Sequence, residues 1–126
     1  MEITIYHNPA CGTSLNALAA IRAAGHKPRI FEYLTTPLSS GAIAALVQHL
    51  NVPVRRVVRS KEPLFQELGL DKKDVTESEL LDAMSEHPIL INRPIVLVQV
   101  NGKITARLCR PSEIVKTLLA GASANA

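Results

Sequence analysis

The chain has 126 residues, 47% of them hydrophobic, with a formal net charge of +3 and a sequence pI near 9.1. This length fits a domain with its own core, and the apolar fraction excludes a disordered chain. The basic residues form no run, which argues against nucleic-acid binding, and no apolar stretch approaches the roughly 20 residues of a membrane span.

The first third of the chain is typical of a β-α-β unit. Residues 2–6 alternate apolar and polar side chains, which predicts a strand. A helix is expected from Thr13 to Ala24, ended by Gly25, and a second strand from 28 to 34. Strands joined by a crossover helix pair in parallel, so we expect a parallel pair here.

The middle of the chain, about 38–88, is predicted to be a helical insertion. Ser39 or Ser40 can cap one helix, and Thr76 with Glu79 forms a capping-box pattern ahead of another. A short helix is expected between them. Apolar side chains recur at helical spacing after each cap, which predicts a buried stripe on both longer helices.

The last third is predicted to form a hairpin and a helix. Strands over 95–100 and 103–108 flank Asn101-Gly102, the strongest short hairpin signal in the chain. A final helix is expected with Pro111 in its first turn, and residues 121–126 are expected to form a frayed tail.

The order of these elements matches an α/β, thioredoxin-like fold, with a mixed four-stranded sheet, flanking helices and the helical insertion. We expect a single domain over residues 1–120. The N-terminus enters a strand directly and shows no signal-peptide pattern, which favours a cytoplasmic location.

Cys11 is the candidate nucleophile. It lies between the first strand and the first helix, where unpaired amides and the helix dipole stabilise a thiolate and could hold an oxyanion beside it. Ser14 stands where a Cys-x-x-Cys redox pair would have its second thiol, so a resolving thiol must come from elsewhere. The other cysteine, Cys109, is expected to be a small buried hydrophobe. The two cysteines fit neither a disulfide framework nor a zinc site, and no metal cluster is expected.

The residues around Cys11 leave several roles open. His7 could favour the thiolate as an imidazolium, relay a proton as a neutral imidazole, or simply pack at the strand end. Asn8 could orient the loop, and Ser14 could donate a hydrogen bond to the sulfur or to a bound anion. A cysteine phosphatase would need an arginine six residues after its cysteine, and Ala17 occupies that position, which excludes this class.

Arginines distant in the sequence could supply positive charge for binding an oxyanion. Guanidinium groups bind tetrahedral oxyanions in a bidentate fork, and the candidates are Arg59, Arg93, Arg107 and Arg110. The predicted hairpin pairs Val96 with Arg107, which puts Arg93 and Arg107 at its open end. Strict pleating would turn these two side chains to opposite faces, and a bend such as a cis bond before Pro94 would correct that. The other arginines are expected to be solvated surface charges: Arg22, Arg29, Arg55 and Arg56.

Four ordered segments resemble the glutaredoxin-coupled arsenate reductases: 7–14, 57–59, 87–96 and 107–113. The resemblance as a whole extends from residue 3 to about 119. The resemblance puts the catalytic thiol on Cys11, with His7 and Ser14 beside it. It puts three anion-binding arginines on Arg59, Arg93 and Arg107. The loop residues expected to help bind the substrate are Asn8, Gly12 and Thr13. Leu15 departs from the family, which commonly has an arginine there, so a nearby positive charge is lost.

The resemblance implies a reaction in which the Cys11 thiolate attacks arsenate, glutathione adds to the arsenic adduct, and glutaredoxin completes the reduction to arsenite. Glutathione and glutaredoxin are then external reductants, with no bound cofactor expected. Phosphate and sulfate would be weak competitors, and the chain would act as a monomer without nucleic-acid or membrane partners.

Two alternatives come from other functional classes. Regulators of the same fold family bind RNA polymerase, and they often carry Cys-x-x-Cys, whereas this chain has Ser14. A general glutathione-dependent thiol reductase is the other alternative, and it would not require three convergent arginines.

Overall fold

The computed structural model describes residues 1–124, which group into two compact units. The first unit combines Met1–Tyr33 with the segment from Arg93 onward, and the second is Leu34–Asn92. The second unit therefore contains the whole predicted helical insertion. The candidate nucleophile Cys11 lies in the first unit.

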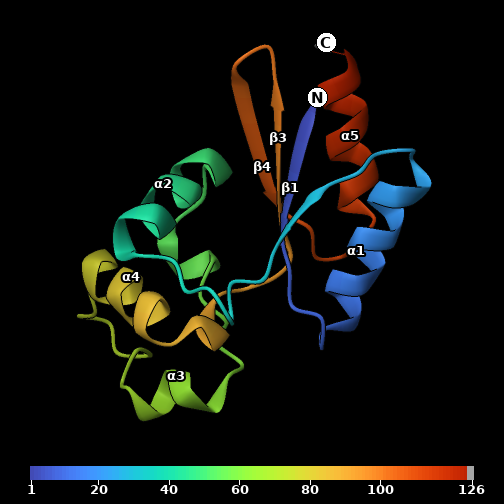
Figure 1. The fold of residues 1–126 in the computed structure, drawn as a ribbon. Coiled ribbons are helices and arrows are strands. Elements are labelled where there is room, and N and C mark those ends of the chain that lie inside the picture. The colour runs from blue at the N-terminus through green and yellow to red at the C-terminus, as the bar shows by residue number, and fades with distance from the viewer. Residues whose placement is uncertain (125–126) are drawn as a thin grey trace. The chain divides into compact units, whose positions relative to one another are not determined.

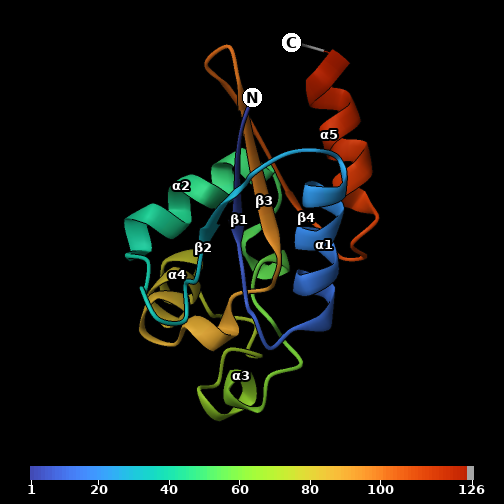
Figure 2. The ribbon, with the colours of Figure 1, turned by 45° about the vertical axis from the view of Figure 1, so that its right-hand side comes forward.

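The first unit is built on a four-stranded mixed sheet (Figure 1), and Figure 2 shows its strands in the order β2-β1-β3-β4. Its strands are β1 (Glu2–Tyr6), β2 (Arg29–Phe31), β3 (Ile95–Val100) and β4 (Lys103–Leu108). β1 pairs parallel with β2 and antiparallel with β3, and β4 is antiparallel to β3. The predicted mixed sheet and parallel pair are confirmed. β2 is shorter than the expected 28–34 because β1 ends at Tyr6, opposite Phe31, and offers no further ladder.

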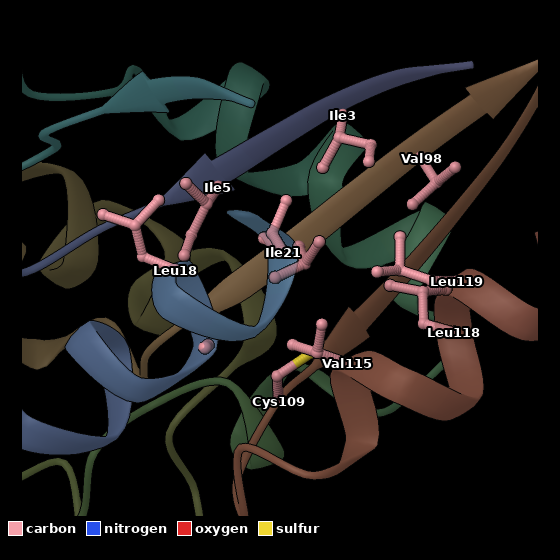
Figure 3. Packing of buried hydrophobic residues seen from close by; sticks show 11 residues of the cluster. Ile3, Ile5, Leu18, Ile21, Val98, Cys109, Val115, Leu118 and Leu119 are labelled. Atoms are coloured by element: carbon pink, nitrogen blue, oxygen red, sulfur yellow. The ribbon is translucent and has the colours of Figure 1, made fainter. Parts of the chain in front are cut away.

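Helices α1 (Gly12–Ala23) and α5 (Ile114–Ala124) share a hydrophobic core with the sheet. Figure 3 shows Ile3, Ile5 and Val98 of the sheet beside α1 and α5 side chains. The core residues from the helices include Leu18 and Ile21 of α1 and Val115, Leu118 and Leu119 of α5. Cys109 is fully buried in the same core, as its assignment as a small hydrophobe predicts.

The C-terminal part of the chain differs from expectation at two points. Pro111 lies in a turn before α5, where its carbonyl accepts a bond from the Ile114 amide, so the helix begins later than predicted. The frayed tail predicted from Gly121 is wrong as far as Ala124, because α5 continues through this alanine-rich segment and alanine is the strongest helix former. Residues 125–126 of that predicted tail lie outside the described residues.

The β3–β4 hairpin forms as predicted. Asn101 and Gly102 have φ values of 52° and 79°, which are the positive values that a type I′ turn requires. The turn sets the register that pairs Val96 with Arg107. The strand end beyond Leu108 therefore leads straight into the segment that carries Cys109 and Arg110.

The second unit is helical. Its elements are α2 (Ser40–Leu50), η1 (Val54–Arg56), α3 (Pro63–Glu67), α4 (Glu77–Glu86) and η2 (Pro88–Leu90). Ser39 caps α2 by accepting from the Ala42 amide, and Thr76 caps α4 by accepting from the Glu79 amide, so both predicted caps are confirmed. α2 and α4 pack side by side within this unit (Figure 2).

Arg55 has a structural role that the sequence did not suggest. Arg55 is exposed, as a surface charge should be, but its guanidinium also donates to three backbone carbonyls, those of Leu70, Lys72 and Val75, at 3.5, 3.2 and 3.3 Å. These bonds tie the loop before α4 to η1. The periodicity of apolar residues carries no signal for such a contact.

Candidate active site

The loop that carries Cys11 is held by its own backbone and by Asn8. The Cys11 amide donates to the Asn8 carbonyl at 3.0 Å, and the Asn8 side-chain oxygen accepts from the Ala10 amide at 2.9 Å. Cys11 itself is the N-cap of α1, with extended backbone angles. Asn8 is buried and its carboxamide oxygen accepts a hydrogen bond within the loop, so it orients the loop as predicted. Its contact with substrate stays a prediction.

Ser14 and His7 form a buried pair beneath the loop. The Ser14 hydroxyl lies 2.6 Å from His7 Nδ1 and accepts from the Asn8 amide at 3.1 Å. Ser14 is fully buried and His7 nearly so. Burial lowers the pKa of His7, with Arg22 acting in the same direction and Glu32 opposing, so the neutral imidazole is favoured over the imidazolium.

The Cys11 sulfur is poised to ionise near neutral pH. Burial raises the pKa of this thiol, but the Ser14 amide and the guanidinium groups of Arg93 and Arg110 outweigh it, so the pKa falls from 9.0 to about 7. The thiol is partly exposed. A reactive cysteine needs this combination of a stabilised thiolate and access for a reaction partner.

Two arginines converge on the sulfur from neighbouring segments. Arg110 Nη1 lies 3.6 Å from Cys11 Sγ and donates to the Arg93 carbonyl at 2.9 Å. The side chain of Arg93 is buried and also hydrogen-bonds to the sulfur. The Cys109 amide donates to the Pro94 carbonyl at 2.8 Å, which joins the two segments. The peptide bonds Arg93–Pro94 and Arg110–Pro111 are both cis.

Arg110 occupies the place that the family resemblance assigns to Arg107. Arg107 is an exposed residue within β4, and its charge acts on the thiol of Cys109. Its position in the ladder opposite Val96 fixes the direction of its side chain. Arg110 lies past the end of β4, where no ladder constrains it. The structure therefore brings Arg110, already a candidate cation by its residue type, to the sulfur, and it does not bring Arg107 there.

The remaining predicted site residues have simpler positions. Gly12 and Thr13 begin α1, where the first amides of a helix have no intrahelical acceptor and can bind an anion. Gly12 is exposed, and a Cβ built on it would meet open space. Arg59 belongs to the second unit, where its amide donates to the Leu90 carbonyl at 2.7 Å and its Nε lies 3.3 Å from a Glu62 carboxylate oxygen. Its part in an anion site stays a prediction.

The described part of the chain contains neither a group of metal-ligating side chains nor a membrane-spanning helix. Across residues 1–124, His, Cys, Asp and Glu side chains nowhere gather in a group of three that could hold a metal ion. In the same residues, every helix is too short or too polar to span a membrane.

Comparison with known proteins gives consistent matches. The sequence profile of the ArsC family matches residues 6–118. An arsenate reductase of Rhizobium meliloti is 50% identical over 119 residues, which are 94% of this chain and 82% of that protein. An arsenate reductase of Escherichia coli K12 is 45% identical over 125 residues, 99% of this chain and 86% of that one.

A solved structure shows the same architecture. The structure of an arsenate reductase from Vibrio cholerae superposes with a TM-score of 0.86 at 41% identity, covering 93% of this chain and 97% of that chain. The predicted thioredoxin-like sheet with flanking helices is confirmed by this match.

Proposed function

The chain belongs to the ArsC family, and we propose that it is an arsenate reductase whose Cys11 thiolate attacks arsenate. One observation carries the proposal: the sulfur of the partly exposed Cys11 lies at the start of α1 and accepts hydrogen bonds from the guanidinium groups of Arg93 and Arg110. A thiolate and an arsenate dianion repel each other. Fixed positive charge at the sulfur offsets that repulsion before any bond forms.

We propose that the substrate site combines the two guanidinium groups with the amides of Gly12 and Thr13. Guanidinium groups match the oxygen pairs of a tetrahedral oxyanion, and helix-start amides add donors without adding a full charge. Arg59 is a further proposed contributor, as the resemblance implies. Phosphate and sulfate have the same shape as arsenate and would compete for this site.

The proposed reaction balances with two thiols from outside the chain. Cys11 sulfur bonds to arsenic as one arsenate oxygen leaves as water, and glutathione sulfur replaces a second oxygen in the same way. A glutaredoxin thiolate then attacks the glutathione sulfur. A disulfide forms, the sulfur–arsenic bond breaks, and its electron pair reduces As(V) to As(III). Water displaces Cys11 from arsenic, which releases arsenite and regenerates the thiol.

The protein's own residues have separate proposed roles in these steps. Arg93 and Arg110 bind substrate and stabilise the Cys11 thiolate, both as an attacking and as a leaving group. The buried pair of His7 and Ser14 holds the loop in place, with the Ser14 amide aimed at the sulfur. We propose no bound cofactor, and glutathione and glutaredoxin act as external reductants.

Cys109 supports the need for external thiols. It is fully buried, and burial raises its pKa to about 12, so it cannot act as a resolving thiolate at neutral pH. A reducing compartment such as the cytoplasm would supply glutathione and glutaredoxin. We also propose that the protein is a monomer, which light scattering would test.

A coupled assay tests the proposal. Arsenite formation should require arsenate, glutathione and glutaredoxin together, and phosphate should inhibit competitively against arsenate. Replacing arsenate with a small glutathione disulfide should give little turnover. Efficient disulfide reduction without arsenate turnover would instead identify a general thiol reductase. Absence of both activities would favour a binding protein.

A further inference from the structure

Leu15 is an exposed apolar side chain beside the candidate nucleophile. Its side chain is 47% exposed, and it is one of four exposed large hydrophobic residues in the described chain. It follows Cys11 by one helical turn, since its amide donates to the Cys11 carbonyl at 3.0 Å. Residues one turn apart lie on the same side of a helix. Leu15 therefore lies one turn along α1 from Cys11 and outside the buried stripe of this helix.

The loop adds to this apolar surface. Pro9 and Ala10 are also exposed, and the sequence from Pro9 to Asn16 contains no charged residue. We call Pro9, Ala10 and Leu15 the apolar collar. The positive charges at the sulfur come from Arg93 and Arg110, which lie on other segments. The collar is thus an uncharged rim of exposed residues before and after Cys11 in the chain.

A reaction partner must approach across this rim. Of the chain's two cysteines, Cys109 is fully buried with its pKa raised by burial, so the thiol that completes the reaction belongs to another molecule. In the proposed reaction, that thiol attacks the glutathione sulfur, which is separated from the Cys11 sulfur only by the arsenic atom. A protein that brings a cysteine so close must cover the first turn of α1. Apolar side chains that become buried favour such an association, and a few of them supply most of its strength.

We infer that the apolar collar is the docking surface for a protein dithiol whose reactive cysteine is surrounded by uncharged, apolar residues, with Leu15 as its main contact. The inference rests on the proposed function and names the surface that its protein reductant uses. Glutathione by itself is a poorer fit for the collar, because it is a small molecule with two carboxylates and gains little from an apolar rim.

An intramolecular role for Leu15 makes a different prediction. Ala10 and Leu15 occupy the N′ and N4 positions of α1, where a hydrophobic staple can fix the entry of the chain into a helix. A staple would act on stability and on the thiol itself. A docking surface acts on the encounter with the reductant, so the two roles separate in kinetic measurements.

The test compares Leu15→Gln with Leu68→Gln. Glutamine keeps the length, the absence of charge and much of the helix propensity of leucine. Leu68 is a matched control because it is 43% exposed and lies outside the collar. The steady-state assay varies glutaredoxin at saturating arsenate and glutathione, and a second series varies glutathione. Single-turnover loss of the Cys11 thiol on mixing with arsenate follows the first step without glutaredoxin.

We expect Leu15→Gln to raise the KM for glutaredoxin about fivefold to tenfold, the usual effect of losing one central interface side chain. Its single-turnover rate and melting temperature should stay close to those of the parent, and Leu68→Gln should leave the KM for glutaredoxin unchanged. An unchanged KM in Leu15→Gln, or equal rises in both variants, would overturn the docking surface. A rise in the KM for glutathione alone would assign Leu15 to the tripeptide, and a large fall in melting temperature would assign it to the staple. Failure of the parent protein to reduce arsenate at all would reject the proposed function and not this surface alone.

Discussion

Cys11 and Cys109 differ in what surrounds their sulfur atoms. Cys11 is partly exposed at the start of a helix. Its sulfur accepts hydrogen bonds from the Ser14 amide and from the guanidinium groups of Arg93 and Arg110. Cys109 lies in the core among aliphatic side chains, and its sulfur has a long contact of 3.7 Å with the Arg107 carbonyl. The result is a pKa of about 7 for one thiol and about 12 for the other. Desolvation acts on both, and only Cys11 has donors that outweigh it.

The arginines near these cysteines show that closeness in the sequence does not decide which arginine stabilises which thiolate. Arg110 follows Cys109 directly in the chain, yet its guanidinium bonds to Cys11. Arg107 precedes Cys109 by two residues, and its charge lowers the pKa of Cys109 only against a larger effect of burial. The end of β4 separates the two arginines. A side chain within a ladder keeps the direction of its strand, whereas one past the strand end can turn toward a neighbouring loop.

The largest expected effect concerns the cysteines themselves. Cys11→Ser should lower arsenate turnover by at least about 10³-fold, because a serine hydroxyl stays protonated where the thiol ionises. Cys109→Ala should keep most of the activity and lose about 1 kcal/mol of stability from the core. Turnover and urea unfolding of both variants check this. An inactive but folded Cys109→Ala protein would contradict the assignment of the nucleophile.

The arginines provide the next largest contrast. Arg110→Ala should lower kcat/KM by an amount equivalent to about 2–4 kcal/mol of transition-state stabilisation, the scale of losing one preorganised donor. Arg110→Lys should recover only part of it because lysine lacks the planar fork. Arg107→Ala is the matched control, since it removes an arginine from the same segment and should change kcat/KM little. Arg93→Ala should resemble Arg110→Ala. The reverse result, with Arg107→Ala as the impaired variant, would restore the assignment made from the resemblance.

Elements with strong local signals could be predicted from the sequence. The Asn101-Gly102 turn, the caps at Ser39 and Thr76, and the glycine after α1 each act within a few residues, and each formed as expected. The paired strands of the hairpin followed from its turn. The boundaries of an element are harder to predict when they depend on a partner distant in the sequence. β2 is an example, because its length is set by where β1 ends.

The candidate site was only partly predictable for the same reason. Cys11, His7 and Ser14 lie within eight residues, and the strand-to-helix pattern places them together. The second arginine at the sulfur, beside Arg93, depended on which of two arginines in the segment Arg107-Leu108-Cys109-Arg110 lies past the strand end. Residue type does not distinguish them. The strand end at Leu108 was itself predicted, and it is the signal that could have favoured Arg110.

A titration of thiol reactivity sharpens the contrast between the cysteines. Iodoacetamide should alkylate Cys11 with a midpoint near pH 7, because the thiolate is the reactive form and the pKa is lowered to about 7. The rate should fall about tenfold per pH unit below that midpoint and level off above it. At pH 7, half of Cys11 is ionised against about one hundredth of a thiol whose pKa is 9.0, a difference of about fiftyfold.

Cys109 is the internal control in this titration. In the folded chain it should stay unmodified throughout, because it is buried and protonated up to about pH 12. In urea both thiols should react alike, with a midpoint near that of free cysteine. A Cys11 midpoint near 9 in the folded protein would contradict the role of the Ser14 amide, Arg93 and Arg110. Mass spectrometry of digested protein assigns the modification to each site.

The smallest expected effect separates a backbone amide from a side-chain hydroxyl at Ser14. Ser14→Ala removes the hydroxyl that bonds to His7 Nδ1 and accepts from the Asn8 amide, both in buried surroundings. Buried groups left without a partner cost about 1–3 kcal/mol, so the free energy of unfolding should fall by that amount. The bond that lowers the pKa of Cys11 comes from the backbone amide of residue 14, which alanine keeps. The alkylation midpoint should therefore stay near 7. Ser39→Ala is the matched control, because it removes an exposed cap with a single bond and should cost only about 1 kcal/mol. A Ser14→Ala protein with unchanged stability and a Cys11 midpoint near 9 would show that the hydroxyl, and not the amide, holds the thiolate.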